Sequence, residues 1–120
     1  MINGLRQVAQ RAESLDRAVA FYRDTLGLPL IARFGPLAFF DLGNTRLLIE
    51  EGSTGSLLYL HVDDVRVTCE ELVGKGVKLE GEPHVVFNDG DGTFGPKGED
   101  EWLAFFYDSE NNLVGLMSRS

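Results

Sequence analysis

Apolar and polar residues follow one another in short runs along this chain, and turn residues separate the runs. Residues 5–12 alternate loosely, which predicts a short strand. Apolar residues then recur at helical spacing from Leu15 to Leu26, after the N-cap residue Ser14 and before Gly27. Three further apolar runs, divided by hairpin-type turns, predict strands at residues 30–34, 37–42 and 46–50. The first part of the chain is thus a strand, a helix and three strands.

The second part of the chain repeats this plan. The tetrapeptide Leu-Ala-Phe-Phe occurs at residues 37–40 and again at 103–106. Asp63 or Asp64 caps a second predicted helix that ends at the glycines of residues 74–76. The strands predicted around it are residues 57–62, 77–80 running on towards 87, 102–107 and 113–117. Two copies of one unit bury the same face of each copy, and the concave seam between such halves is a natural ligand site.

Composition and charge narrow the class of protein. With 120 residues, of which 43% are hydrophobic, the chain has the size of one globular domain. The net charge of −8 argues against nucleic acid and anionic membrane surfaces as partners, and it fits neutral, apolar or cationic small molecules better. Cys69 is the only cysteine, on the apolar stripe of a predicted helix, so we expect a small buried hydrophobe rather than a nucleophile. No signal-peptide pattern and no membrane-spanning apolar run is present, which favours a cytoplasmic protein.

One segment breaks the symmetry of the two halves. Residues 88–100 form a loop of glycine, aspartate, proline and lysine, where the first half has only Gly35-Pro36. Its glycine and carboxylate positions do not match a calcium loop, so we do not expect calcium. Loops of this length in compact domains are often lids. We expect a lid that closes His84, Phe94 and Trp102 onto a bound molecule, with a solvated insertion as the alternative.

Three strings carry a family resemblance. They are Ser-Leu-Asp-Arg-Ala-Val-Ala-Phe-Tyr-Arg-Asp-Thr-Leu-Gly-Leu at residues 14–28, Val-Asp-Asp-Val at 62–65 and Asp-Ser-Glu-Asn-Asn-Leu at 108–113. Together they resemble the vicinal oxygen chelate superfamily, which includes glyoxalase I, the bleomycin-resistance proteins and the extradiol dioxygenases. The resemblance covers nearly the whole chain. It implies one α+β domain, residues 1–120, of two βαβββ modules (about 1–52 and 56–120) that form a ligand cleft, and it implies a homodimer.

The resemblance also implies where a metal would bind. Metal-dependent members take His or Gln from the first strand, Glu from the fourth, His from the fifth and Glu from the eighth. The corresponding positions here are Gln7, Glu50, Leu57 and Gly115. Because Leu57 and Gly115 cannot serve as ligands, the resemblance implies that the usual divalent metal site is dismantled. Gln7 and Glu50 remain as weak metal candidates.

The candidate site residues follow from these positions. The predicted ligand-binding residues are Gln7, Leu48, Glu50, Leu57, Tyr59, His84, Trp102, Leu113, Gly115 and Met117. The catalytic candidates are Glu50, His84 and Glu101, because His84 and Glu101 would share one face of a hairpin as a minimal acid–base pair. Each also has a plain structural interpretation, as a strand-end carboxylate or a hydrogen-bonded edge histidine.

Two functions remain open at this stage. The first is a small-molecule-binding protein of the bleomycin-resistance type, without cofactor, that holds an apolar, aromatic or cationic compound. The second is a lyase, isomerase or dioxygenase of the same superfamily, either metal-dependent or using acid–base chemistry.

Overall fold

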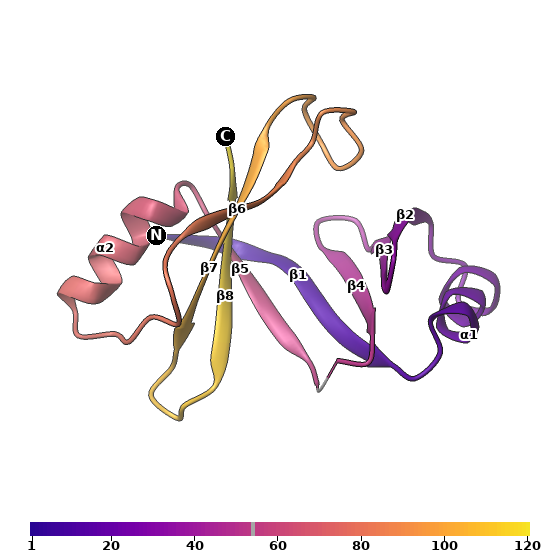
Figure 1. The fold of residues 1–120 in the computed structure, drawn as a ribbon, viewed down its shortest axis with the longest axis horizontal. Helices are drawn as coiled ribbons and strands as arrows, with labels where there is room; N and C mark the ends of the chain where they lie inside the picture. Colours follow the sequence, from indigo (N-terminus) through magenta and orange to yellow (C-terminus); the bar gives the residue numbers. More distant parts are fainter. Residues whose placement is uncertain (54) are drawn as a thin grey trace. The chain divides into compact units, whose positions relative to one another are not determined.

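The structure is a computed structural model that describes residues 1–53 and 55–120. The chain forms two compact units (Figure 1). Unit 2 comprises Arg6–Leu58, and unit 1 comprises Met1–Leu5 together with Tyr59–Ser120. The first residues of the chain therefore group with its second half.

Both halves of the chain have the predicted order of elements. The first half contains β1 (Ile2–Ala12), α1 (Leu15–Ala20), the π-helical turn η1 (Phe21–Thr25), β2 (Leu30–Phe34), β3 (Leu37–Asp41) and β4 (Arg46–Glu51). The second half contains β5 (Leu57–Val62), α2 (Val65–Gly74), β6 (His84–Asn88), β7 (Asp100–Tyr107) and β8 (Leu113–Arg119). The predicted fold class, α+β from two βαβββ modules, is confirmed.

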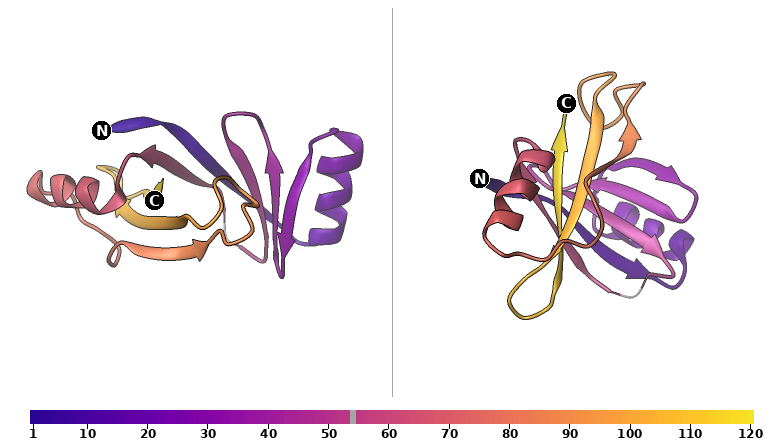
Figure 2. Two further views of the ribbon diagram at one scale, coloured as in Figure 1. Left: turned by 90° about the horizontal axis from the view of Figure 1, so that it is seen from above. Right: turned by 60° about the vertical axis from the view of Figure 1, so that its left-hand side comes forward.

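In unit 2 the helix covers one face of the sheet. The strands follow the order β2-β3-β4-β1, and β1 pairs with β4 in parallel while the other pairs are antiparallel. Helix α1 lies alongside this sheet (Figure 2, left). Alternate residues of a strand point to opposite faces, and one set packs with the helix in a core of Ala12, Leu15, Val19, Ala38, Phe40, Leu47 and Ile49. The Ser14 hydroxyl accepts a hydrogen bond from the Arg17 N–H, as expected for its N-cap position.

Unit 1 repeats this arrangement with α2. Its strands follow the order β5-β8-β7-β6, with β5 parallel to β8. The core under α2 contains Val62, Val65, Cys69, Ala104 and Leu116. Burial raises the pKa of the Cys69 thiol, which fits the predicted role of a buried hydrophobe.

Several boundaries differ from the sequence-based expectations. Strand β1 begins at Ile2 instead of residue 5, and β7 begins at Asp100 instead of residue 102. The first helix is α-helical only as far as Ala20 and continues as the π-helical turn η1. The strand expected at residues 77–80 forms an isolated bridge between Leu79 and Phe106, because Gly81 turns the chain with a positive φ of 76° before β6 begins. Strand β8 runs on to Arg119 instead of ending at residue 117.

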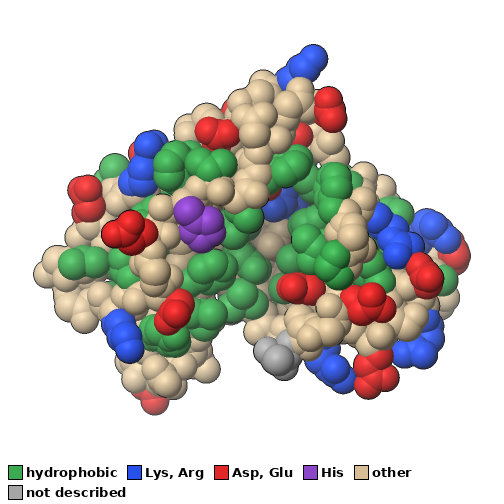
Figure 3. All heavy atoms as spheres, in the orientation of Figure 1, with side chains coloured by type: hydrophobic (Ala, Val, Ile, Leu, Met, Phe, Trp, Pro, Cys, Tyr) green, Lys and Arg blue, Asp and Glu red, His purple; other side chains and the backbone are tan. Residues whose placement is uncertain are grey.

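The outer strand of unit 1 carries exposed apolar residues. These are Val85 and Val86 of β6, and Leu113 at the start of the inner strand β8 is exposed as well. Hydrophobic side chains are visible on the face of the molecule that Figure 3 shows. A bulge between Val85 and Phe87 interrupts the pairing of β6 with β7. Bulges of this kind discourage edge-to-edge association of sheets. In the described part of the chain, no helix combines the length and apolarity needed to cross a membrane.

Candidate functional site

The sheet of unit 2 has a second face, opposite α1, which we call the helix-free face of unit 2. Directly paired residues share a face, so the register places six residues of β1 and β4 there: Gln7, Ala9, Arg11, Arg46, Leu48 and Glu50. Leu37 and Phe39 of β3 lie on the same face, opposite Glu50 and Leu48. Three of the predicted ligand-binding residues, Gln7, Leu48 and Glu50, are therefore brought together on one face of unit 2.

The side chain of Gln7 is hydrogen-bonded to the cationic side chain of Arg46. The Gln7 side chain is 3% exposed, and its Oε1 accepts a hydrogen bond from Arg46 Nε. The Arg46 guanidinium also lies over the Phe39 ring, with its Cζ 5.2 Å from the ring centroid. The amide oxygen that a metal would need at this position thus already bonds a positive charge. Sequence reasoning missed Arg46, although an arginine in an otherwise apolar strand was the available signal.

The helix-free face of unit 1 is built in the same way. It contains Tyr59 of β5, Leu103 and Phe105 of β7, and Gly115 and Met117 of β8. The Tyr59 ring lies directly over Gly115, since a β-carbon added at Gly115 would stand 2.6 Å from Tyr59 Cδ1. The Tyr59 and Phe105 rings meet edge to face with centroids 5.9 Å apart. Any side chain at position 115 would collide with the tyrosine.

The register also relates the two units residue by residue. Phe39 lies opposite Leu48, and Phe105 lies opposite Gly115. Since Phe39 and Phe105 occupy the same place in the repeated tetrapeptide, Leu48 corresponds to Gly115. With Gly115 at the eighth-strand position that the resemblance implies, the corresponding fourth-strand position is Leu48, two residues before Glu50.

Glu50 has a different counterpart. It lies opposite Leu37, whereas Met117 lies opposite Leu103, the matching leucine of the second tetrapeptide. Glu50 is half-buried and corresponds to Met117. Its carboxylate is a polar group on the helix-free face of unit 2 and is not the register counterpart of Gly115.

His84 and Glu101 belong to the predicted hairpin, but they are not register partners. His84 lies opposite Leu103, and Glu101 lies opposite Phe87 on β6 and Arg119 on β8. His84 is exposed, with its Nδ1 3.1 Å from the Glu82 carbonyl oxygen. Glu101 is 3% exposed, and its Oε1 lies 3.6 Å from Arg119 Nη1. Because Glu101 and Leu103 are two residues apart on β7, the register places His84 and Glu101 on one face of the hairpin, as predicted, although they are not directly paired. The contact of the His84 ring with the Glu82 carbonyl oxygen fits the plain interpretation of a hydrogen-bonded edge residue.

Trp102 faces the helix and not the predicted site. It packs against the core under α2, and the Arg66 guanidinium lies over its ring at 4.2 Å. Its neighbours Glu101 and Leu103 are on the opposite face because side chains alternate along a strand. Trp102 is therefore unsuited to the stacking role that we expected from its place beside the loop.

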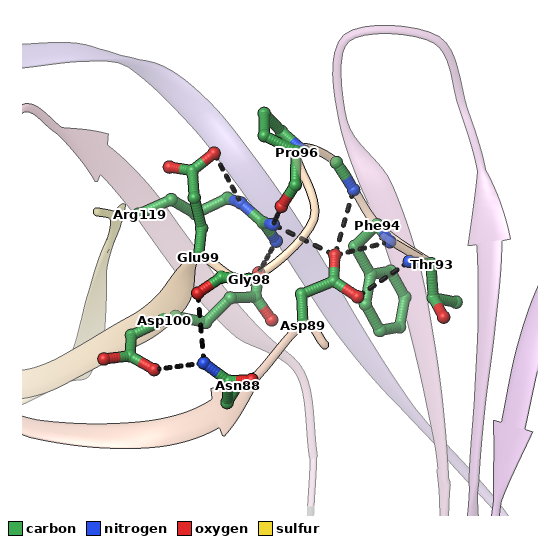
Figure 4. A network of polar contacts seen from close by, with 11 residues as sticks. Asn88, Asp89, Thr93, Phe94, Pro96, Gly98, Glu99, Asp100 and Arg119 are labelled. Atoms are coloured by element: carbon green, nitrogen blue, oxygen red, sulfur yellow. Dashed lines mark hydrogen bonds and ion pairs between the residues drawn. The ribbon is translucent and has the colours of Figure 1, made fainter. Parts of the chain in front are cut away.

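The 88–100 loop is ordered around Asp89 (Figure 4). The Asp89 side chain is fully buried and accepts hydrogen bonds from the N–H groups of Thr93, Phe94 and Gly95 at 2.7, 2.9 and 3.1 Å. Arg119 Nη2 donates to the same carboxylate at 2.9 Å. So many bonds to one buried group do not support the expectation of a mobile lid, and the glycines that suggested flexibility instead allow this tight turn.

The same bonds lower the pKa of Asp89. Burial alone would raise the pKa of its carboxyl, but hydrogen bonds from the Phe94 N–H, from Arg119 and from the Thr93 N–H hold it below its ordinary value. A carboxyl whose pKa is lower in the folded chain stabilises the fold above its unfolded pKa, near 3.9. That contribution is lost as the pH falls through the lower, folded pKa.

We therefore predict that acid weakens the native chain more steeply than an Asp89→Asn variant. The measurement is the free energy of unfolding in urea at a series of pH values from neutral down to about 2. Asp24, Asp64 and Asp108 also have lowered pKa values, so the variant keeps part of the slope. Asp91→Asn, an exposed change in the same loop, should behave like the native chain. Equal slopes for the native chain and Asp89→Asn would contradict the prediction.

The residues at the four ligand positions do not fit a divalent metal. Leu48, Leu57 and Gly115 offer no donor atom, and Gln7 bonds Arg46. A metal site of this family needs oxygen and imidazole donors with open positions for substrate. Among the described residues, no group of three or more His, Cys, Asp and Glu side chains is placed to hold a metal ion.

Sequence comparison identifies the family. The model of the Glyoxalase/Bleomycin resistance protein/Dioxygenase superfamily matches residues 4–116, and the chain belongs to this superfamily. It is similar to the uncharacterized protein YraH of Bacillus subtilis strain 168, at 29% identity over 135 aligned residues that cover 93% of this chain and 95% of that protein.

Solved structures share the fold. Methylmalonyl-CoA epimerase from Mycobacterium tuberculosis has a TM-score of 0.77 and 18% identity, covering 98% of this chain and 88% of the epimerase. The Mn(II)-bound glyoxalase from Novosphingobium aromaticivorans has a TM-score of 0.72 and 18% identity, and the match covers 98% of this chain but 39% of the glyoxalase. Identities this low show the common glyoxalase-type fold and no shared chemistry.

Proposed function

We propose that this chain is a small-molecule-binding member of the superfamily that works without a divalent metal at the family's ligand positions. The observation that carries the proposal is the Tyr59 ring over Gly115. That ring fills the space into which a glutamate at position 115 would have to project, because even a β-carbon there would lie 2.6 Å from Tyr59 Cδ1. A phenol ring thus stands where metal-dependent members need a carboxylate.

The other unit supports the same proposal. Arg46 holds the Gln7 oxygen, and Leu48 is the register counterpart of Gly115. A divalent cation at Gln7 would have to displace a guanidinium and would gain no carboxylate from Leu48. Repulsion between the two cations and the loss of the Gln7–Arg46 hydrogen bond both oppose metal binding.

The side chains on the two helix-free faces suggest the class of ligand. Unit 1 has Tyr59, Leu103, Phe105 and Met117 on this face, and unit 2 has Phe39 and Leu48, all of them apolar or aromatic. Phe105 is half-buried and the other five are buried, so a ligand has to displace part of their packing. The polar residues Gln7, Arg46 and Glu50 share the face of unit 2. Aromatic rings bind other rings edge to face or offset-stacked. The net charge of −8 disfavours anions. We therefore propose a neutral or cationic aromatic compound as the ligand, bound against Tyr59.

Three compounds of one shape test this proposal: 2-naphthalenemethanol, 2-naphthylmethylammonium and 2-naphthoate. Titration calorimetry with the native chain should show binding of the alcohol and the ammonium compound, and weaker binding of the carboxylate. Tyr59→Leu removes the ring and should weaken binding about tenfold, equivalent to about 1.4 kcal/mol. Trp102 fluorescence is not a suitable readout because that residue faces α2.

Tyr22→Leu is the matched control. Tyr22 packs with the core under α1, on the other face of its sheet, so the same substitution there should leave affinity unchanged. The proposal fails if none of the three compounds binds, or if Tyr59→Leu binds them as tightly as the native chain does.

A further inference from the structure

Residues 89–99, here called the Asp89 loop, enclose one carboxylate. Asp89 Oδ1 accepts from the Thr93 N–H, and Oδ2 accepts from the Phe94 and Gly95 N–H groups. Figure 4 shows all three amides pointing at the same side chain. Successive backbone N–H groups that converge in this way form a nest, which is an anion-binding arrangement.

Arg119 of β8 completes the nest from outside the loop. Its Nη2 donates to Asp89 Oδ2 at 2.9 Å and to the Pro96 carbonyl oxygen at 3.1 Å. Its Nε and Nη1 are buried and have no hydrogen-bond partner among the described residues. The carboxylates of Glu99 and Glu101 are 4.0 and 3.6 Å from Nε and Nη1, beyond good hydrogen-bond distance. The enclosure therefore has more donors than the Asp89 carboxylate uses.

The backbone of the loop is shaped to fit the guanidinium. A β-carbon at Gly95 would lie 3.3 Å from Arg119 Cζ, so the loop could approach less closely with any larger residue. Gly92 has a positive φ of 68°, which favours glycine. The backbone of Asp89 is also hydrogen-bonded within the loop, since its carbonyl oxygen accepts hydrogen bonds from the Gly92 and Gly98 N–H groups.

We propose that the Asp89 loop and Arg119 form a carboxylate-binding pocket whose occupant is the chain's own Asp89. The loop then takes its ordered conformation because a carboxylate fills the pocket. Attachment of that carboxylate to the chain serves only to keep its local concentration high. A small free monocarboxylate should therefore take its place when the Asp89 side chain is cut back. This inference does not depend on the proposed ligand of Tyr59.

The test is chemical rescue of Asp89→Ala, which removes only the carboxylate group and leaves room for formate. The midpoint of thermal unfolding should fall by on the order of 10 °C relative to the native chain. Sodium formate should restore part of that loss, because a ligand that binds only the folded state stabilises it. Acetate, larger by a methyl group, should restore less, and sodium chloride at the same ionic strength should restore none.

Two controls make the result specific. Asp91→Ala removes an exposed carboxylate from the same loop, so it should be close to the native chain and insensitive to formate. Amide hydrogen exchange of the native chain should show protection at Thr93, Phe94 and Gly95. That protection should be lost in Asp89→Ala and regained with formate.

Several outcomes would overturn the proposal. They are equal effects of formate and chloride on Asp89→Ala, equal midpoints for Asp89→Ala and Asp91→Ala, or unprotected amides at residues 93–95 of the native chain. If Asp89→Ala does not fold in plain buffer, it should refold in formate and not in chloride. Failure to refold in either salt counts against the pocket.

Discussion

Arg119→Gln is expected to lower the free energy of unfolding by about 3 kcal/mol, the lower end of the range for removing one partner of a buried ion pair. The variant leaves the fully buried Asp89 carboxylate without its guanidinium, although three backbone N–H groups still compensate part of its charge. Glutamine is shorter and cannot supply both the bond to Asp89 and the bond to the Pro96 carbonyl oxygen. Urea unfolding at neutral pH measures the loss.

Arg33→Gln is the matched control for this prediction. The Arg33–Asp16 pair has the same 2.9 Å separation as Arg119–Asp89, but its two side chains are 40% and 89% exposed. Exposed ion pairs contribute less than about 1 kcal/mol. If the two variants lose the same free energy of unfolding, burial does not increase the contribution of the Asp89–Arg119 pair to stability.

The second prediction with a large effect concerns Gly115. Gly115→Ala should destabilise the fold by about 1–3 kcal/mol, the usual cost of forcing an extra methyl group into packed structure. The methyl would stand 2.6 Å from Tyr59 Cδ1 and 3.0 Å from Cε1, so the ring would have to move out of its packing with Phe105. In a Tyr59→Ala background the same substitution should cost little, because the clashing ring is gone.

A double-mutant cycle measures this coupling directly. Gly74→Ala is the control, because a β-carbon at Gly74 meets nothing within 4 Å. It should leave stability unchanged or raise it slightly, since alanine is the better helix former at the end of α2. If the losses of unfolding free energy in Gly115→Ala and Tyr59→Ala are additive, the tyrosine ring does not occupy the space over position 115.

The order of elements could be predicted from the sequence because both halves of the chain show the same pattern. The two Leu-Ala-Phe-Phe strings fall in β3 and β7, and helical spacing after Ser14 and Asp64 located both helices. These signals are local in the sequence.

The errors in the candidate site have a different cause. The sequence placed Trp102 in the site because it is next to the long loop, and the resemblance placed Glu50 there. However, a shift of one residue turns a strand side chain to the other face, and a shift of two moves it along the same face. Only the pairings of β3 with β4 and of β7 with β8 fixed these positions. The partners of Arg46 and Tyr59, Gln7 and Gly115, are distant in sequence, so these two pairings could not be predicted from local patterns.

The order within the loop could not be predicted for a related reason. Glycines in a long loop suggest mobility, whereas here they permit the amides of residues 93–95 to approach Asp89. The partner that fixes the loop, Arg119, lies 30 residues further along the chain. The predicted homodimer and the cytoplasmic location stay predictions, and sedimentation velocity at micromolar concentration tests the first of them.

The central claim, that the family's metal positions no longer bind a divalent ion, is tested most directly by metal analysis of the native chain. The chain is purified without chelators, its metal content is measured by mass spectrometry, and it is then titrated with Mn(II) in a calorimeter. The account predicts less than stoichiometric metal and no saturable binding at micromolar Mn(II). One Mn(II), Zn(II) or other divalent ion per chain, lost in a Gln7→Ala variant, would contradict it.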